Sequence, residues 1–169
     1  MLDRRAALRA GLIAALIFGL AGTAMSPPAP RFVWNVSESA PVGLWYVTPD
    51  ASPGRGDSVA ARLAVPWREL AARRHYLPSN VPLIKRVAAS DGGRICAAGN
   101  AISIDGTAVA MRRRFDGAGR PIPGWSGCRT LGADEFLLLM DAENSFDGRY
   151  FGPTTRRDII GKAIPLWVR

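Results

Sequence analysis

NVSESAPVGLWY, residues 35–46, combines a rigid polar corner with the start of a buried strand. Ser37 and Ser39 come just before a proline and a glycine, and the Leu-Trp-Tyr-Val run that follows is typical of a strand. Pro41 fixes its own φ and biases the residue before it toward extended geometry, and Gly43 permits a tight bend or a close backbone approach. Ser39 on such a corner is a candidate nucleophile. Alternatively, both serines only satisfy the hydrogen bonds of a turn.

The N-terminal residues have the pattern of a membrane-targeting segment. Three arginines within the first nine residues precede an uncharged apolar run over residues 10–25. This run is intermediate in length between the apolar core of a secretory signal and a full ~20-residue span, so a cleaved signal and a short anchor both fit. The arginines favour a cytoplasmic N-terminus. We therefore expect residues 1–28 to be a signal anchor and spacer, and residues 29–169 to form one domain outside the cytoplasm.

The composition argues against nucleic-acid and metal chemistry. The net charge of +8 raises the question of an anionic partner, but the basic residues are scattered and no RNA-binding or helix-turn-helix pattern accompanies them. Solvated basic faces with some attraction to anionic lipid fit better. Two cysteines and one histidine do not make a zinc site of the usual composition. His75 lies in a short helix pattern and is expected to be a surface side chain.

Two basic residues interrupt the apolar strand pattern VPLIKRVAA, residues 81–89. The side chains of a strand alternate between its faces, so one of Lys85 and Arg86 points inward if the other is solvated. A surface lysine on a half-exposed strand is the usual arrangement. The apolar neighbours on both sides of the pair favour a buried amine here.

The other strand candidates are short and are separated by turn-forming residues. They lie at residues 32–34, 44–47, 58–63, 94–96, 101–105, 107–111, 135–140 and 159–168. Residues 67–76 are the one soluble helix that we expect, and residues 117–127 and 141–152 are predicted to be loops. The sequence therefore predicts a mostly β fold with one short soluble helix and one N-terminal transmembrane helix.

Cys96 and Cys128 are the two cysteines of a domain assigned to an oxidising compartment. A disulfide between them is the natural inference, and it would stabilise the fold by about 3–4 kcal/mol in the chain-entropy model. Two free buried thiols are the alternative.

Three separate stretches together resemble the type I signal peptidase family. In chain order they are SESAPVGLWY, LIKRVAASDGG, and NSFDGRYFGP followed by IIGKAIPL. The asparagine ahead of the serines, the compressed corner before Pro41, the paired cysteines and the small size resemble the TraF branch. Its members are conjugative-transfer proteases that mature pilin precursors. The resemblance implies the coiled β-sheet of a signal peptidase.

The resemblance also implies a role for each matched residue. Ser39 would be the nucleophile and Lys85 the general base. Ser37 would join the Ser39 backbone N–H in an oxyanion hole, and Ser145 would orient the lysine. The supporting positions would be Asp147, Arg149 and Arg86.

A serine hydroxyl needs a base that takes its proton. An unperturbed lysine is neutral in only roughly one molecule in 2,500 at pH 7. Desolvation disfavours the ammonium and lowers the pKa of a lysine by several units. The chemistry therefore requires that Lys85 be buried and close to Ser39.

The expected protein is a serine endopeptidase of the inner (cytoplasmic) membrane, single-pass, with a periplasmic catalytic domain and no cofactor. Its partners would be the membrane and precursor proteins with small residues, typically alanine, before the cleaved bond; we expect a monomer. A general leader peptidase and a catalytically silent component of a mating or secretion apparatus are the alternatives. A self-cleaving Ser-Lys repressor is less favoured because it needs a DNA-binding domain. Hydrolysis and transfer of the acyl group to an amine, giving a cyclic pilin, both stay open.

Overall fold

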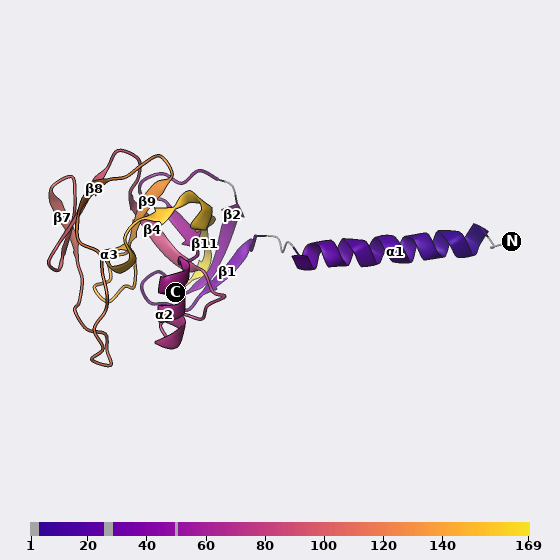
Figure 1. The fold of residues 1–169 in the computed structure, drawn as a ribbon, viewed down its shortest axis with the longest axis horizontal. Coiled ribbons are helices and arrows are strands. Elements are labelled where there is room, and N and C mark those ends of the chain that lie inside the picture. Colours follow the sequence, from indigo (N-terminus) through magenta and orange to yellow (C-terminus); the bar gives the residue numbers. More distant parts are fainter. Residues whose placement is uncertain (1–3, 26–28, 50) are drawn as a thin grey trace.

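The computed structural model of the chain describes residues 4–25, 29–49 and 51–169. Helix α1 (Arg4–Met25) extends away from a β domain that contains the rest of the described chain (Figure 1). Apolar side chains of α1, among them Leu12, Ile17 and Phe18, are exposed.

The N-terminal predictions extend beyond what the structure describes. Residues 1–3 of the predicted anchor and residues 26–28 of the predicted spacer lie outside the described residues. Over the three described ranges, no helix has the length and apolarity that crossing a membrane requires. The transmembrane helix expected from the sequence therefore stays a prediction.

A curled antiparallel sheet forms the larger part of the domain (Figure 1). Its strands, in spatial order, are β1 (Phe32–Asn35), β2 (Gly43–Pro49), β11 (Ile159–Val168), β3 (Ser58–Ala61), β4 (Leu83–Ala89), β9 (Glu135–Leu139) and β10 (Thr154–Thr155). The long last strand, β11, therefore joins the N-terminal hairpin to the middle of the sheet. Where it passes β2, a Cβ on Gly43 would collide with the Trp167 carbonyl oxygen, and the φ of Gly43 is +142°. The close backbone approach expected at this glycine is confirmed.

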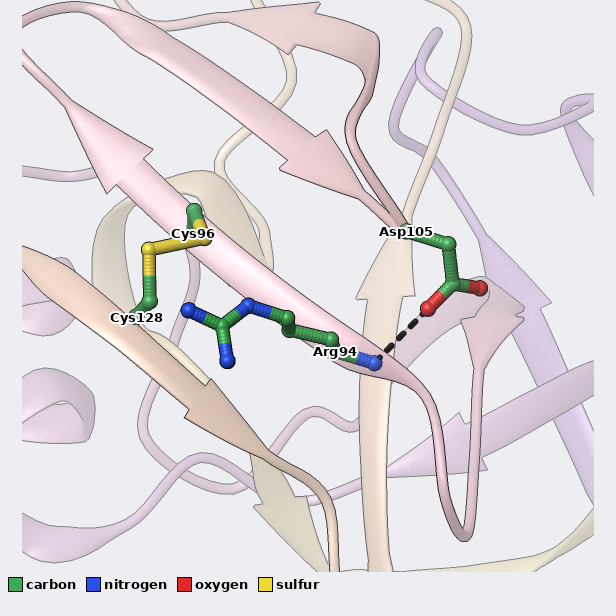
Figure 2. The surroundings of a disulfide bond; sticks show 4 residues. All are labelled: Arg94, Cys96, Asp105 and Cys128. Carbon is green, nitrogen blue, oxygen red and sulfur yellow. Dashed lines mark hydrogen bonds between the residues drawn. A yellow bond between two sulfur atoms is a disulfide. The ribbon is translucent and has the colours of Figure 1, made fainter.

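A smaller antiparallel sheet contains the disulfide. Its strands, in spatial order, are β7 (Thr107–Met111), β6 (Ala101–Ile104), β5 (Arg94–Ala98) and β8 (Gly127–Thr130). Cys96 of β5 and Cys128 of β8 lie directly opposite each other and are bonded, as predicted (Figure 2). At the start of β5, the Arg94 backbone N–H donates to Oδ1 of Asp105, which lies in the turn between β6 and β7, at 2.9 Å.

One hydrophobic cluster spans both sheets. Ile95 and Ile102 of the smaller sheet pack with Leu137 and Leu139 of β9. Burying each such side chain contributes about 1.5–3 kcal/mol relative to exposure. Because β9 pairs with β4, this cluster also supports the strand that carries Lys85.

The helices differ from the prediction in number and in bounds. Helix α2 (Val65–Arg73) begins earlier than predicted because a proline in its first turn is already set for helix geometry, and it ends before His75, whose φ is +59°. The predicted polar loop 141–152 contains a second short helix, α3 (Gly148–Phe151), and a 3₁₀ turn follows at η1 (Arg156–Asp158). Expecting a single soluble helix was therefore wrong, because a four-residue helix has no periodicity to detect. His75 is exposed, as predicted.

Candidate active site

A buried asparagine holds the corner that carries the serines. Asn35 ends β1, and its Nδ2 donates to the carbonyl oxygens of Ser37 at 2.9 Å, Ala40 at 2.9 Å and Pro41 at 3.0 Å. Its Oδ1 accepts from the Ser37 backbone N–H at 3.1 Å. One amide side chain thus replaces the backbone partners that an irregular loop lacks. The corner is held from inside, and Ser39 lies at its tip.

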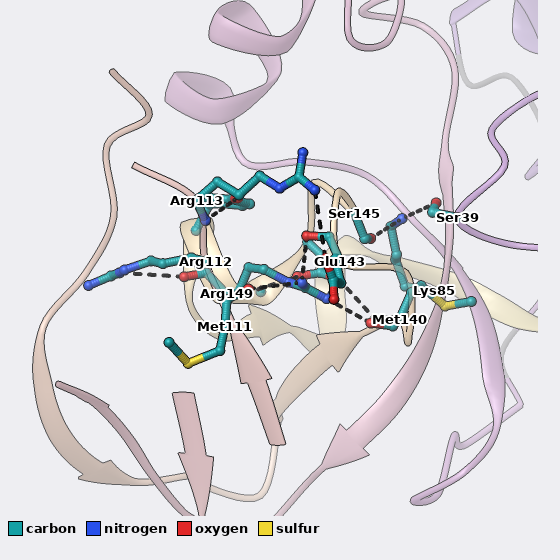
Figure 3. A network of polar contacts seen from close by, with 12 residues as sticks. Ser39, Lys85, Met111, Arg112, Arg113, Met140, Glu143, Ser145 and Arg149 are labelled. Atoms are coloured by element: carbon teal, nitrogen blue, oxygen red, sulfur yellow. Dashed lines mark hydrogen bonds and ion pairs between the residues drawn. The ribbon is translucent and has the colours of Figure 1, made fainter. Parts of the chain in front are cut away.

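Lys85 reaches this corner from the middle of the larger sheet. It is only 2% exposed, and its Nζ donates to Ser39 Oγ at 2.6 Å and to Ser145 Oγ at 3.0 Å (Figure 3). Ser145 is itself 1% exposed and lies in the loop before α3. Three segments distant in sequence therefore bring together a partly exposed hydroxyl, a buried amine and a buried hydroxyl. This inward placement of Lys85 is the one that strand alternation and its apolar neighbours predict.

Burial changes the acidity of this amine. Desolvation lowers the pKa of Lys85 to about 8; the nearby Asp147 carboxylate opposes the shift, and the Arg149 charge adds to it. In the described part of the chain, no carboxylate forms an ion pair with Lys85. A pKa near 8 leaves roughly one molecule in ten neutral at pH 7, compared with about one in 2,500 for a solvated lysine. The site can therefore supply a free amine near neutral pH.

Ser37 contacts Ser39 directly. The two hydroxyl oxygens are 2.8 Å apart, and the Ser39 backbone N–H donates to Ser37 Oγ at 3.4 Å. Both groups expected to form an oxyanion hole are therefore adjacent, and in this structure they bond to each other. A substrate oxygen would have to replace that contact to accept from both.

Asp147 and Arg149 form a buried ion pair behind Ser145. Arg149 Nε donates to Asp147 Oδ1 at 2.8 Å and Nη2 to Oδ2 at 3.1 Å, and the side chains of Arg149 and Asp147 are 2% and 0% exposed. Asp147 also accepts from the Arg149 backbone N–H at the start of α3. The guanidinium further donates to three backbone carbonyl oxygens, those of Met111, Met140 and Glu143 (Figure 3). The pair fixes the loop that positions Ser145.

Arg86 lies apart from this group. It is next to Lys85 but points to the other face of β4, where it forms an ion pair with the exposed Asp141. The Asp147–Arg149 pair lies next to Ser145, whereas the Arg86 side chain bonds to Asp141. The predicted site residues that the structure brings into one hydrogen-bonded group are Ser37, Ser39, Lys85 and Ser145.

A cleft of about 470 Å³ contains the serines and the lysine in its lining. Residues 34–39 line it from the corner, residues 81–85 from the entry to β4, and residues 144–146 from the loop before α3. Extended peptides bind along strands and their approaches through backbone hydrogen bonds. Such a peptide has room here to place a carbonyl carbon at Ser39.

The sequence pattern of the family described as "Signal peptidase, peptidase S26" matches residues 4–167. The chain belongs to this family. Relatives of this S26 chain include the plasmid transfer protein TraF of Escherichia coli, which is 33% identical, with 74% of this chain and 76% of the relative covered. The conjugal transfer protein TraF of Agrobacterium fabrum is 32% identical, with 98% of each chain covered. The predicted family, including its TraF branch, is confirmed.

Among solved structures, the S26 chain is similar to a signal peptidase I from Enterococcus faecalis. The two are 16% identical with a TM-score of 0.36, and 66% of this chain and 97% of the other are covered. Membership of the S26 family implies a serine peptidase, and the TraF relatives connect the chain with conjugation.

Asn35 is a site residue of this S26 protein to which the sequence analysis gave no role. The available signal was an asparagine two positions before a serine, the spacing at which Asn side chains bond the backbone of a turn. Its three carbonyl partners lie up to six positions further along the chain and meet its side chain only in the folded corner.

Proposed function

We propose that this chain is a membrane-anchored serine endopeptidase of the signal-peptidase type, with a Ser39–Lys85 dyad that processes exported precursor proteins. The observation that carries the proposal is the 2.6 Å contact between the buried Lys85 amine and the Ser39 hydroxyl. Burial disfavours the charged form of an amine, and the neutral form is the state that a general base requires.

The proposed reaction begins with neutral Lys85. Its lone pair accepts the Ser39 proton while Oγ attacks the substrate carbonyl carbon, and one amine hydrogen stays bonded to Ser145. The resulting ammonium gives its proton to the leaving amine as the peptide bond breaks. Water then attacks the acyl-enzyme with Lys85 again as base, and the proton returns to Ser39 when the acid product leaves.

The negative charge that develops on the substrate oxygen needs donors fixed in advance. The Ser39 backbone N–H and the Ser37 hydroxyl serve here, because they already lie together on the corner held by Asn35. One such donor contributes about 10²–10³ in rate in well-studied cases. Their present mutual bond would be replaced by bonds to the substrate.

The biological setting of the proposal follows from the relatives and from the N-terminus. The names of the relatives, a plasmid transfer protein and a conjugal transfer protein, favour a precursor used in conjugation. The resemblance to the TraF branch implies that this precursor is a pilin with small side chains before the cleaved bond. Residues 1–28, with the exposed apolar side chains of α1, would anchor a monomer in the inner membrane and keep residues 29–169 in the periplasm. Restricting enzyme and precursor to one membrane raises their effective concentration.

A catalytically silent structural protein is the second candidate, and the buried Lys85 argues against it. Burying an amine lowers stability, and an apolar residue of similar volume fills such a position at less cost. Retaining the amine beside a serine favours an active enzyme.

Cleavage of a precursor tests the function. We expect the purified full chain to cut candidate pilin precursors after a small residue and to form an acyl-enzyme on Ser39 that mass spectrometry detects. Ser39→Ala should abolish cleavage, and Ser103→Ala on β6 should leave it unchanged. A product one water heavier than the cyclic form identifies hydrolysis. Undiminished cleavage by Ser39→Ala would refute the assignment.

A further inference from the structure

Residues 112–126 form an arm between β7 and β8 that leaves the smaller sheet and returns to it. The arm is a narrow hairpin in which Phe115 bridges to Pro121. Its base is fixed by Arg112, whose guanidinium donates to three backbone carbonyl oxygens, those of Gly99, Trp125 and Arg149. The tip of the arm contacts the end of α2.

Asp116 lies at the tip of the arm, and each of its two carboxylate oxygens accepts from a different set of donors. Oδ1 accepts from the backbone N–H groups of Ala118 and Arg120, both at 2.9 Å, and so closes the turn of the arm itself. Oδ2 accepts from the Tyr76 hydroxyl at 2.5 Å and from Arg120 Nε at 2.8 Å. The Asp116 side chain is only 5% exposed although it lies on a loop. Its second oxygen therefore ties the arm to the chain that follows α2.

Two arginines add further contacts between the arm and the end of α2, one from each side. Arg74, the residue that caps α2, donates to the Pro121 carbonyl at 2.9 Å and lies 3.6 Å from Asp116 Oδ2. Arg120 donates back to the Arg74 carbonyl at 3.4 Å and lies over the Tyr76 ring. Hydrogen bonds that involve charged groups are stronger than those between neutral groups. We call Arg74, Tyr76, Asp116 and Arg120 the clasp.

The clasp joins two parts of the candidate active-site cleft. The chain after α2 lines the cleft with Tyr76 and Leu77, and the arm lines it with Phe115, Asp116 and Ile122. Tyr76 and Asp116 are 40 positions apart in sequence. Tyr76 lies between two strands of the larger sheet, β3 and β4, and Asp116 lies between two strands of the smaller sheet, β7 and β8. A loop held only by its base is mobile. The clasp gives the arm a second attachment beyond its base.

We propose that the clasp is a substrate-positioning device: it holds the arm as a preformed wall against which the precursor chain lies when its cleaved bond reaches Ser39. The inference rests on the proposed peptidase function, and it gives the clasp residues a role in binding the precursor chain. A wall formed in advance spares the substrate the cost of ordering the arm. Breaking the clasp should therefore weaken binding of a long substrate and leave the chemistry at Ser39 intact.

Asp116→Asn is the sharpest test, because the amide oxygen can still close the turn while the charge toward Tyr76 and the arginines is lost. With a precursor peptide, we expect KM to rise on the order of tenfold and kcat to stay within about twofold. Tyr76→Phe should change KM in the same direction by less. We expect a small alanine ester to need no contact with the arm, so it should be hydrolysed at the wild-type rate. The matched control is Glu135→Gln, which breaks the Arg129–Glu135 pair on the surface and should change nothing.

Measuring peptide affinity in a variant that cannot cleave distinguishes an effect of the clasp on binding from an effect on the reaction at Ser39. In the Ser39→Ala background, Asp116→Asn should weaken the Kd of the same peptide on the order of tenfold. This result would support the clasp even if the wild-type protein cleaved nothing, in which case the proposed function alone would fail. An unchanged Kd and KM in Asp116→Asn would overturn the clasp. So would a parallel loss of peptide and ester hydrolysis, which would indicate a general structural role.

Discussion

Replacing Lys85 with methionine is expected to lower kcat/KM for precursor cleavage by about a thousandfold while the protein stays folded. The base that takes the Ser39 proton is lost, and general-base catalysis contributes about 10²–10⁴ in rate. Methionine has a similar length and fits the buried position of a residue that is 2% exposed. Steady-state kinetics on the purified variant measures the effect.

Stability separates a chemical effect from a folding effect in this variant. Burial lowers the pKa of Lys85 to about 8 in the folded state, so below pH 8 that state carries the full cost of burying the ammonium. The cost declines as the pH rises from there, disappears above the unfolded pKa of about 10.4, and is absent in Lys85→Met. The variant also loses the bond to the buried Ser145 hydroxyl, which costs about 1–3 kcal/mol. We therefore expect the two effects to offset each other and the variant to stay folded, with a stability close to that of the wild type at pH 7.

The matched control for this change is Lys162→Met. It removes the chain's other lysine, which pairs with Asp57 at the surface, and it should keep wild-type activity. A Lys85→Met protein with wild-type activity would contradict the proposed dyad.

Replacing Arg149 with leucine is expected to reduce the free energy of unfolding by about 3–5 kcal/mol. The substitution leaves the Asp147 carboxylate buried without its partner, and breaking one half of a buried ion pair costs this much. It also removes the donors to three backbone carbonyl oxygens. Urea unfolding with the Cys96–Cys128 disulfide intact measures the loss.

The matched control for the buried pair is Arg129→Leu. Arg129 also pairs with a carboxylate, Glu135, but its side chain is 51% exposed. Exposed pairs contribute about 0–1 kcal/mol. Equal stability losses in the two variants would mean that the buried pair is not the support that its contacts indicate.

The position of the candidate base could be predicted from the sequence because it depends on a local rule. Strand alternation places Lys85 and Arg86 on opposite faces, and the apolar flanks decide which of them is buried. The stiff corner from Pro41 to Gly43 is local in the same sense. Both features follow from a few neighbouring residues, and the structure has them as expected.

The clasp and the support behind Ser145 could not be predicted in this way. Tyr76 and Asp116 are in contact although 40 positions separate them in sequence, and no pattern in either segment predicts this pairing. Strand β8 is exposed along its whole length, so it lacks the alternation that marks a strand. Helix α3 starts at Asp147 through a single capping bond within a stretch that otherwise has the composition of a loop. Each of these features is decided by tertiary contacts.

A pH titration of the Lys85 amine tests directly whether this buried lysine can act as the base. The chain contains two lysines, so selective isotope labelling of lysine side chains gives two NMR signals, and Lys162→Arg identifies which one belongs to Lys85. We expect a titration midpoint of about 8 for Lys85. A midpoint at or above the ordinary lysine value of about 10.4 would contradict it.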